Sequence, residues 1–196
     1  MDITTAPDRS INSLSSNDYH SFVDTELAKN GFRIKHITQE LMESRTDDFM
    51  NFVNSIRKEY SAAYGWSEES REYFLNPLKD KFKFSFTVMN ENDEICFVNF
   101  SSVYDKIIHN HCTYARKDTR SFNFAKLHII KLCQAGIDAG FTHQEGFWPK
   151  TNNGSIILFM RMGWQIDSIR NNKELFMIAD LEKVRNQTYS LVKAGK

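Results

Sequence analysis

Apolar residues recur with two different periods along the chain, and each change of period marks a border between strand and helix. Residues 32–37 alternate apolar with basic side chains, which is the two-residue period of a β-strand. Over residues 49–60 the apolar side chains return at three- and four-residue steps, so they share one face of a helix that we expect to end near Gly65. A second, shorter helix is predicted over 66–77, with Ser67 as its N-cap.

The two-residue period then returns in three consecutive segments. Residues 82–88 alternate phenylalanine and valine with polar side chains, and the polar cluster at 90–93 predicts a turn. Residues 95–104 and 106–116 follow at the spacing of an antiparallel meander. We therefore expect three antiparallel strands before the next helix.

The C-terminal half alternates between the two periods. The elements expected there are, in order, a helix from Phe124 to near Gly140, a strand at 146–148, a helix from Asn152 or Asn153 to Gly163, and strands at 164–169 and 174–179. Asn171 and Asn172 predict a turn with positive φ between the last two strands. The predicted order is β, α, α, β, β, β, α, β, α, β, β.

The charges of the chain cancel, because 25 lysines and arginines balance 25 aspartates and glutamates. This balance argues against a surface built as a whole to attract nucleic acid or anionic lipid. No apolar stretch approaches the roughly 18 residues that cross a bilayer, and the 3 cysteines fit neither a disulfide framework nor a thiolate metal site. We expect a cytoplasmic protein with no nucleic-acid partner, no membrane partner and no metal.

One domain accounts for most of the length. The first 18 residues lack the basic start and apolar block of a signal peptide and are rich in serine, asparagine, threonine and aspartate. We therefore expect a flexible tail over residues 1–30, a single domain over 31–184 and a C-terminal tail over 185–196.

A basic turn precedes the helix that begins near Phe124. Residues 116–126 hold Arg116, Lys117, Arg120 and Lys126 against Asp118, four positive charges minus one negative, or plus three. A solvated loop before a helix start would explain this run without any ligand. A helix N-terminus flanked by cations is also suited to phosphate, because its backbone N–H groups point outward.

The segment from Arg120 to Ala125 resembles the pyrophosphate loop of the GNAT superfamily of acyl-CoA-dependent N-acyltransferases. That loop reads Arg or Gln, two residues, Gly, one residue, then Gly or Ala. Arg120 and Ala125 match, whereas Asn123 replaces the glycine. Asparagine is the non-glycine residue that best tolerates a left-handed backbone, but its side chain narrows the approach of a phosphate.

Residues 152–164 resemble a second GNAT segment, which reads Asn, two residues, Ala, three residues, Tyr, three residues, Gly, Phe. Asn152, Gly163 and Trp164 match in register, and Ser155 stands for the small residue. In the family the Asn commonly holds the pantetheine arm and the Tyr often protonates the departing thiolate; here the Tyr position is Phe159. An N-capped core helix that ends at a glycine would explain the same residues without a ligand.

The resemblance implies an α/β fold with a mixed, mostly antiparallel sheet of about seven strands and about four flanking helices. It implies an acyl-CoA donor, acetyl-CoA or longer, or an acyl-carrier protein, and an amine acceptor. The acceptor would be bound opposite the donor by aromatic residues such as Tyr60, Tyr64, Trp66 and Tyr73, which could equally belong to the core or to a homodimer interface. The donor-binding residues it implies are Ala115, Arg116, Arg120, Ser121, Phe122, Asn123, Phe124, Ala125 and Asn152.

The candidate catalytic residues lie on the strand predicted at 106–116. Regular alternation places His109 and His111 on one face of this strand and Cys112 and Tyr114 on the other. Neutral imidazole suits removal of a proton from the amine, so His111 is the first candidate, with Tyr114 as an alternative acid. A partly buried strand histidine without a catalytic role is the competing explanation. The two functions that remain are an N-acyltransferase acting on a small-molecule amine and a GNAT-fold binding module that no longer catalyses.

Overall fold

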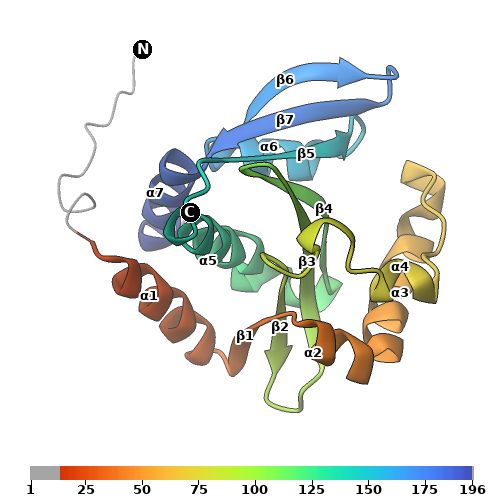
Figure 1. Cartoon of the computed structure of the whole chain (residues 1–196), viewed down its shortest axis with the longest axis horizontal. Coiled ribbons are helices and arrows are strands. Elements are labelled where there is room, and N and C mark those ends of the chain that lie inside the picture. Colours follow the sequence, from red (N-terminus) through yellow and green to blue (C-terminus); the bar gives the residue numbers. More distant parts are fainter. Residues whose placement is uncertain (1–13, 196) are drawn as a thin grey trace.

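A seven-stranded sheet divides the molecule, with helices on both faces (Figure 1). The computed structural model describes residues 14–195, apart from the side chains of Leu78 and Arg120. The strand order is β1-β2-β3-β4-β5-β7-β6, and within residues 14–195 only β4 and β5 pair in parallel. The strands are β1 Phe32–His36, β2 Phe86–Asn90, β3 Ile95–Tyr104, β4 Ile107–Ala115, β5 His143–Pro149, β6 Gln165–Arg170 and β7 Glu174–Asp180.

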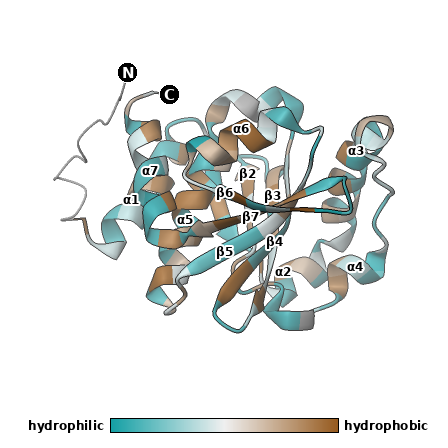
Figure 2. Cartoon of the chain, turned by 90° about the horizontal axis from the view of Figure 1, so that it is seen from above, coloured by the Kyte–Doolittle hydropathy of each residue, from teal (hydrophilic) through white to brown (hydrophobic). Residues whose placement is uncertain are grey.

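Seven α-helices among the described residues cover the sheet. They are α1 Ser16–Ala28, α2 Gln39–Ser44, α3 Thr46–Tyr64, α4 Arg71–Leu75, α5 Phe124–Asp138, α6 Asn153–Arg161 and α7 Leu181–Lys193. Helices α1, α5, α6 and α7 pack on one face and α2, α3 and α4 on the other. Seen from above, α1, α4 and α7 carry hydrophilic residues on the sides that point away from the sheet (Figure 2). The helices bury their apolar sides against the sheet, which gives one hydrophobic core layer on each of its faces.

Most of the predicted elements are confirmed, including the seven strands and the α/β class. Helix α3 ends at Gly65, whose φ of 68° closes it in the left-handed region. Asn171 and Asn172 turn the last hairpin with φ of 50° and 54°. Helix α6 begins after the N-cap Asn152 and is followed by Gly163 at φ 100°.

Both predicted tails are wrong for the described residues. Helix α1 lies where a flexible tail was expected and buries Tyr19, Val23 and Leu27 against α5. Helix α7 continues past residue 185 to Lys193, and Thr188 within it is fully buried. Residues 1–13 lie outside the described part of the chain.

Two boundaries around α4 also differ from the prediction. The N-cap is Ser70, which accepts a hydrogen bond from the Tyr73 N–H, so the helix starts later than Ser67 would place it. Strand β2 starts at Phe86, because Phe82 and Phe84 belong to the turns after a short 3₁₀ segment, Leu78–Asp80. Both phenylalanines are buried. Their burial in a turn gives the same alternation of apolar and polar residues as a strand would.

Strands β4 and β5 separate at their carboxyl ends. They pair only from Ile107 with His143 to Asn110 with Gly146, after which β4 follows β3 and β5 follows β7. At the last pair a Cβ on Gly146 would lie 3.0 Å from the Asn110 carbonyl oxygen and 3.0 Å from the Trp148 ring. The absence of a side chain thus permits close approach just before the strands diverge. Ligands of open α/β sheets bind where strands diverge in this way.

A β-bulge at His111 changes which residues of β4 share a face. Phe100 of β3 pairs with Cys112, and Ser101 pairs with Asn110, so the backbone of His111 has no pairing partner in the ladder with β3. Ser102 then pairs with His109, which places His109 on the same face as Cys112 and Tyr114. The regular alternation predicted for this strand is therefore wrong.

Candidate active site

Two adjoining cavities occupy the cleft between the separated ends of β4 and β5. The first, the helix-end pocket, has a volume of about 520 Å³ and reaches the N-terminus of α5. The second, the strand pocket, has about 310 Å³ and lies along β4 and the end of β5. Both are lined by Trp66, Thr113, Tyr114, Asn152 and Ser155. A molecule in one cavity would therefore meet a molecule in the other beside these five residues.

The floor of the helix-end pocket is the start of α5. Asn123, which stands where the GNAT pattern has glycine, adopts the left-handed conformation with φ 58° and ψ 22°. Its side chain does not cap the helix. The N–H groups of Phe124 and Ala125, in the first turn, have no intrahelical carbonyl to bond. No acidic residue lies in this turn. These features suit an anionic group, since the helix dipole and the N–H groups both face the cavity.

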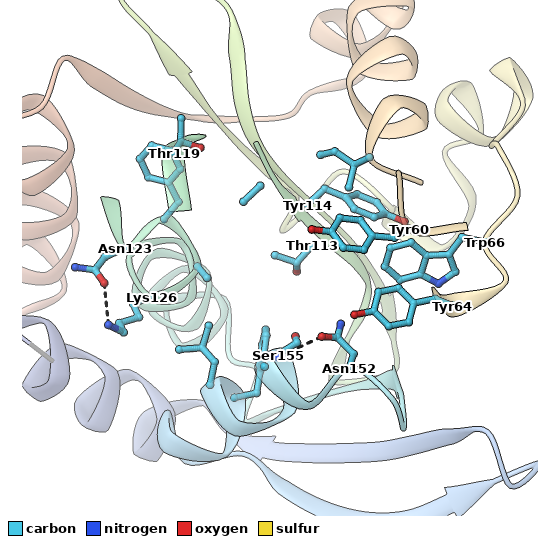
Figure 3. Close-up of a pocket in the computed structure, with 17 residues that line it drawn as sticks. Tyr60, Tyr64, Trp66, Thr113, Tyr114, Thr119, Asn123, Lys126, Asn152 and Ser155 are labelled. Carbon is cyan, nitrogen blue, oxygen red and sulfur yellow. Dashed lines mark hydrogen bonds between the residues drawn. The ribbon is translucent and has the colours of Figure 1, made fainter. Parts of the chain in front are cut away.

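Lys126 contributes positive charge at this helix end. Its Nζ donates a hydrogen bond to Asn123 Oδ1 at 2.8 Å, as drawn in Figure 3. Desolvation lowers the pKa of Lys126, and the positive charge of Arg161 lowers it further. An anion bound here would relieve both effects.

Of the predicted donor-binding residues, some line the helix-end pocket and others are bonded outside it. Ala115, Asn123, Phe124, Ala125 and Asn152 line the helix-end pocket. Arg116 is bonded to Asp118 at 2.8 Å and lies 3.5 Å from Glu94, so its charge is largely balanced. Lys117 is likewise 3.6 Å from Glu59.

The remaining predicted residues lie in the 3₁₀ segment before Asn123. Phe122 packs against Phe32 with ring centroids 4.9 Å apart, and Ser121 is exposed. The side chain of Arg120 lies outside the described residues, so its role stays a prediction.

Strand β4 offers backbone donors to the cleft. The Arg116 N–H bonds to the Cys96 carbonyl of β3 at 2.9 Å. Because successive peptide groups of a strand point in opposite directions, the N–H groups of Ala115 and Thr113 point away from β3, into the gap that β5 has left. Such preorganised donors are what a developing oxyanion needs.

Helix α6 forms the wall opposite. Asn152 Oδ1 accepts the Ser155 N–H at 3.3 Å, so the asparagine caps α6, and its amide nitrogen keeps two further donors near the cleft. Phe159, at the position where the GNAT pattern has Tyr, is 4% exposed and packs 4.8 Å from Trp148 and 5.4 Å from Trp164 between ring centroids. A phenyl ring donates no proton.

An aromatic wall closes the third side (Figure 3). Tyr64 and Trp66 have ring centroids 4.8 Å apart, and Trp66 meets Tyr114 edge to face at 5.7 Å and 90°. Tyr60 stacks on Tyr64, and the hydroxyl ends of both tyrosines point toward the cavity. Tyr73, expected on this side, lines a separate cavity.

Tyr114 is held by a buried ion pair. Its hydroxyl accepts a hydrogen bond from Arg57 Nη1 at 2.7 Å, and Arg57 is bridged to Glu69 at 2.9 Å. Burial raises the pKa of Tyr114 above its ordinary value, although the Arg57 charge opposes this. The phenol therefore stays protonated and keeps its own O–H available to donate.

Two histidines of β4 line the strand pocket, and they differ in their surroundings. His109 Nδ1 lies 3.0 Å from Glu145 Oε1 on β5, and both side chains are mostly buried. A carboxylate on Nδ1 fixes the proton there, which leaves Nε2 as the acceptor. His111 instead bonds through Nε2 to the Ser102 hydroxyl at 2.8 Å. Desolvation and the charges of His109, Lys81 and Lys79 lower the pKa of His111 to about 4.

Sequence reasoning missed Glu145, Arg57 and Glu69. Glu145 meets His109 only because β4 and β5 pair in parallel, 36 residues apart in the chain. Arg57 and Glu69 come from different sides of the turn after α3. No local spacing signals these contacts. In the described part of the chain no three His, Cys, Asp or Glu side chains gather as metal ligands would, and no helix within it is long and apolar enough to cross a membrane.

The class defined by these features is an α/β protein whose binding cleft lies where two parallel strands separate in front of a helix N-terminus. Solved acetyltransferases have the same fold. The chain is similar to the ribosomal-protein-S18-alanine N-acetyltransferase from Escherichia coli, with a TM-score of 0.61 and 12% identity over 76% of this chain and 94% of that one.

Two further structures agree. An acetyltransferase of the GNAT family from Staphylococcus aureus Mu50 superposes with a TM-score of 0.62 at 10% identity, over 76% of this chain and 99% of that one. The PaiA N-acetyltransferase from Thermoplasma acidophilum, in complex with coenzyme A, gives 0.58 at 9% identity, over 76% and 98%. No protein-family model and no curated protein sequence matches the chain. The chain has the GNAT fold, as the sequence motifs predicted. Sequence identities this low establish the fold and nothing more.

Proposed function

We propose that the protein is an N-acyltransferase that moves an acyl group from acyl-CoA to the amine of a small molecule. The observation that carries the proposal is the joined pair of cavities at the separation of β4 and β5. One cavity reaches the N-terminus of α5, and the other is lined by His109, whose Nδ1 is bonded to Glu145. Two substrates need two adjoining sites, and this cleft has them.

The donor fits the helix-end pocket by chemistry. The Phe124 and Ala125 N–H groups together with Lys126 suit the phosphates of coenzyme A, and Asn152 suits an amide of the pantetheine arm. The bound thioester supplies an activated acyl carbon, whose C–S bond breaks as the C–N bond to the amine forms. An acyl-carrier protein could present the same arm, so it belongs in any donor test.

The proton of the amine goes to His109 in this proposal. His109 lines the strand pocket, and Glu145 bonds its Nδ1, so Nε2 is the ring nitrogen left to take the proton, with the carboxylate stabilising the imidazolium that forms. His111, the first candidate from the sequence, ranks second because its pKa of about 4 makes it a weak base. In this proposal the Ala115 and Thr113 N–H groups bind the acyl oxygen, and the Tyr114 hydroxyl gives a proton to the leaving sulfur, because Phe159 carries no donor.

Binding of the donor is tested with the intact chain. Acetyl-CoA, longer acyl-CoAs, coenzyme A and an acyl-carrier protein are titrated while thermal unfolding is followed, because a ligand of the native state raises its stability. We expect Lys126→Glu to abolish most of the shift and Lys183→Glu, the same change on the exposed start of α7, to leave it intact. No shift with any thioester would contradict the donor site.

The second candidate function is a binding module without catalysis. Asn123 in place of glycine and Phe159 in place of Tyr favour it, since each departs from the GNAT pattern. It predicts acyl-CoA binding without thiol release for every amine offered. Thiol release above background, lost in His109→Gln, would exclude it.

A further inference from the structure

A third cavity, the lysine pocket, adjoins the strand pocket and is not used by the proposed chemistry. Its volume is about 230 Å³, and its lining includes Tyr73, Lys79, Lys81, Ser102, Tyr104 and His111. His111 also lines the strand pocket, so the two cavities meet at this side chain. Any acceptor whose amine lies beside His109 could extend past His111 into the lysine pocket.

Lys81 carries a buried positive charge into this cavity. The residue is only 5% exposed, and its Nζ lies 3.8 Å from the Tyr73 ring centroid and 5.3 Å from that of Phe100. The ammonium donates to the Tyr73 carbonyl oxygen. Among residues 14–195 it has no carboxylate within 4.0 Å, and desolvation lowers its pKa to about 8. Buried charges are ordinarily paired, so an unpaired one beside a cavity calls for a counter-ion.

Lys79 is placed on the same cavity by a strained turn. Lys79 and Asp80 both have positive φ, 56° and 52°, although neither is glycine. Lys79 Nζ lies 3.8 Å from the Tyr104 ring centroid and donates to the Tyr104 hydroxyl at 2.5 Å. Backbone strain of this kind persists where the surroundings impose it, often at binding sites.

Two acidic groups close to the lysine pocket are committed elsewhere. Glu69 is bridged to Arg57 at 2.9 Å, and Glu145 is bonded to His109 at 3.0 Å. The pocket therefore keeps two positive charges, those of Lys79 and Lys81. A neutral or cationic group would leave Lys81 uncompensated.

We propose that the lysine pocket binds an anionic group, carboxylate or phosphate, carried by the acceptor amine. The acceptor class is then an amino acid or an amino phosphate, and neither a polyamine nor an uncharged amino sugar. This inference rests on the proposed N-acyltransferase function, because it places the anion at one end of a molecule whose amine lies beside His109.

The test compares amines of equal length with and without an anionic end. Straight-chain amino acids, the matching aminoalkyl phosphates and the matching alkylamines are offered with acetyl-CoA, and kcat/KM is measured from thiol release. We expect the anionic amines to be preferred at least 10-fold, and the better of the two anionic series identifies the group. Equal kcat/KM for charged and uncharged amines would overturn the inference.

Variants assign the preference to the pocket. Lys81→Met and Lys79→Gln should each reduce the preference at least 5-fold, whereas Lys83→Met, an exposed lysine two residues along the chain, should keep it. Lys79 lies on an exposed turn, so its variant remains informative if Lys81→Met folds poorly. A preference that survives both variants would contradict the site.

Direct binding separates this inference from the proposed function. Succinate and inorganic phosphate are titrated into the native protein, Lys81→Met and Lys83→Met by calorimetry, with no donor present. Binding that is lost only in Lys81→Met supports the anion site even if no amine is acylated. Thiol release without discrimination between amines, and without anion binding, would support the proposed function and overturn this inference.

Discussion

The donor and acceptor sides of the cleft are built by different means. The helix-end pocket depends on backbone: the first N–H groups of α5, the left-handed Asn123, and the N–H groups of β4 exposed where β5 departs. The strand and lysine pockets depend on side chains, with His109, Glu145 and Lys81 drawn from three separate segments.

This difference explains what a sequence can reveal about each side. Backbone donors need only a helix start and a tolerant residue, so a short local motif suffices to predict them. Side-chain sites need particular residues brought together by pairing of distant strands. The donor side can therefore be general and the acceptor side specific within one cleft.

The largest effect is expected from His109→Gln, which keeps a hydrogen bond to Glu145 and removes the proton acceptor. We expect kcat to fall about 100- to 1,000-fold, with acyl-CoA affinity unchanged because the helix-end pocket is untouched. Steady-state kinetics and a thermal-shift titration measure the two quantities. A larger loss of kcat in His111→Gln than in His109→Gln would reverse the assignment.

A smaller effect is expected from Tyr114→Phe, at the border of the two cavities. The change removes the O–H and leaves the ring against Trp66. We expect kcat to fall about 10-fold with a thioester donor, since a thiolate leaves readily without full protonation. An unchanged kcat would show that the phenol only anchors Arg57.

Lys81→Met should stabilise the protein at pH 7 by about 1–2 kcal/mol, because it removes a charge that folding desolvates. The pKa of Lys81 is about 8 in the folded protein against 10.5 for an ordinary lysine. Between these values the unfolded chain binds more protons, so the stability of the native protein rises with pH across that window. The buried thiols of Cys96, Cys112 and Cys133 have raised pKa values and oppose this rise near pH 10. Urea denaturation at pH 7 and pH 10 should therefore show a more favourable change of stability with pH in the native protein than in the variant.

Asn123→Gly should have the smallest effect and act only on the donor side. Glycine keeps the left-handed backbone and removes the side chain that narrows the phosphate approach. We expect acyl-CoA to bind about 2- to 5-fold more tightly, measured by calorimetry. Asn171→Gly, at φ 50° in the β6–β7 turn, is the matched control and should leave this affinity unchanged.

The elements with a clear period were predictable from the sequence, and so was the donor-side motif. Helices α3 and α6 bury residues at helical spacing and β5 buries every second residue, whereas β3 is buried on both faces and was predicted from its apolar run and the turns around it. Helix α1 was missed although Tyr19, Val23 and Leu27 recur at four-residue steps behind the N-cap Ser15, because the polar composition of the N-terminal residues was interpreted as a tail. The contact with α5 that buries these three residues is a tertiary one and is not visible in the sequence.

The acceptor side could not be predicted, for a different reason. The contact of His109 with Glu145 needs the parallel pairing of β4 with β5, and the bulge at His111 brings His109 to the same face as Cys112 and Tyr114. The burial of Lys81 needs Tyr73 and Phe100 to surround it. Each condition is a property of tertiary structure, and in sequence Lys81 resembles its exposed neighbours Lys79 and Lys83.

The bulge at His111 adds one residue to β4 without moving the residues on either side of it out of register with β3. If His111 were deleted, Cys112 would stay opposite Phe100, Asn110 opposite Ser101 and His109 opposite Ser102, in an unbroken ladder. His109 would therefore keep its place in the strand pocket, and the hydrogen bond between His111 and Ser102 would be lost. The extra residue thus supplies a second imidazole beside the first, with the two ring centroids 5.0 Å apart.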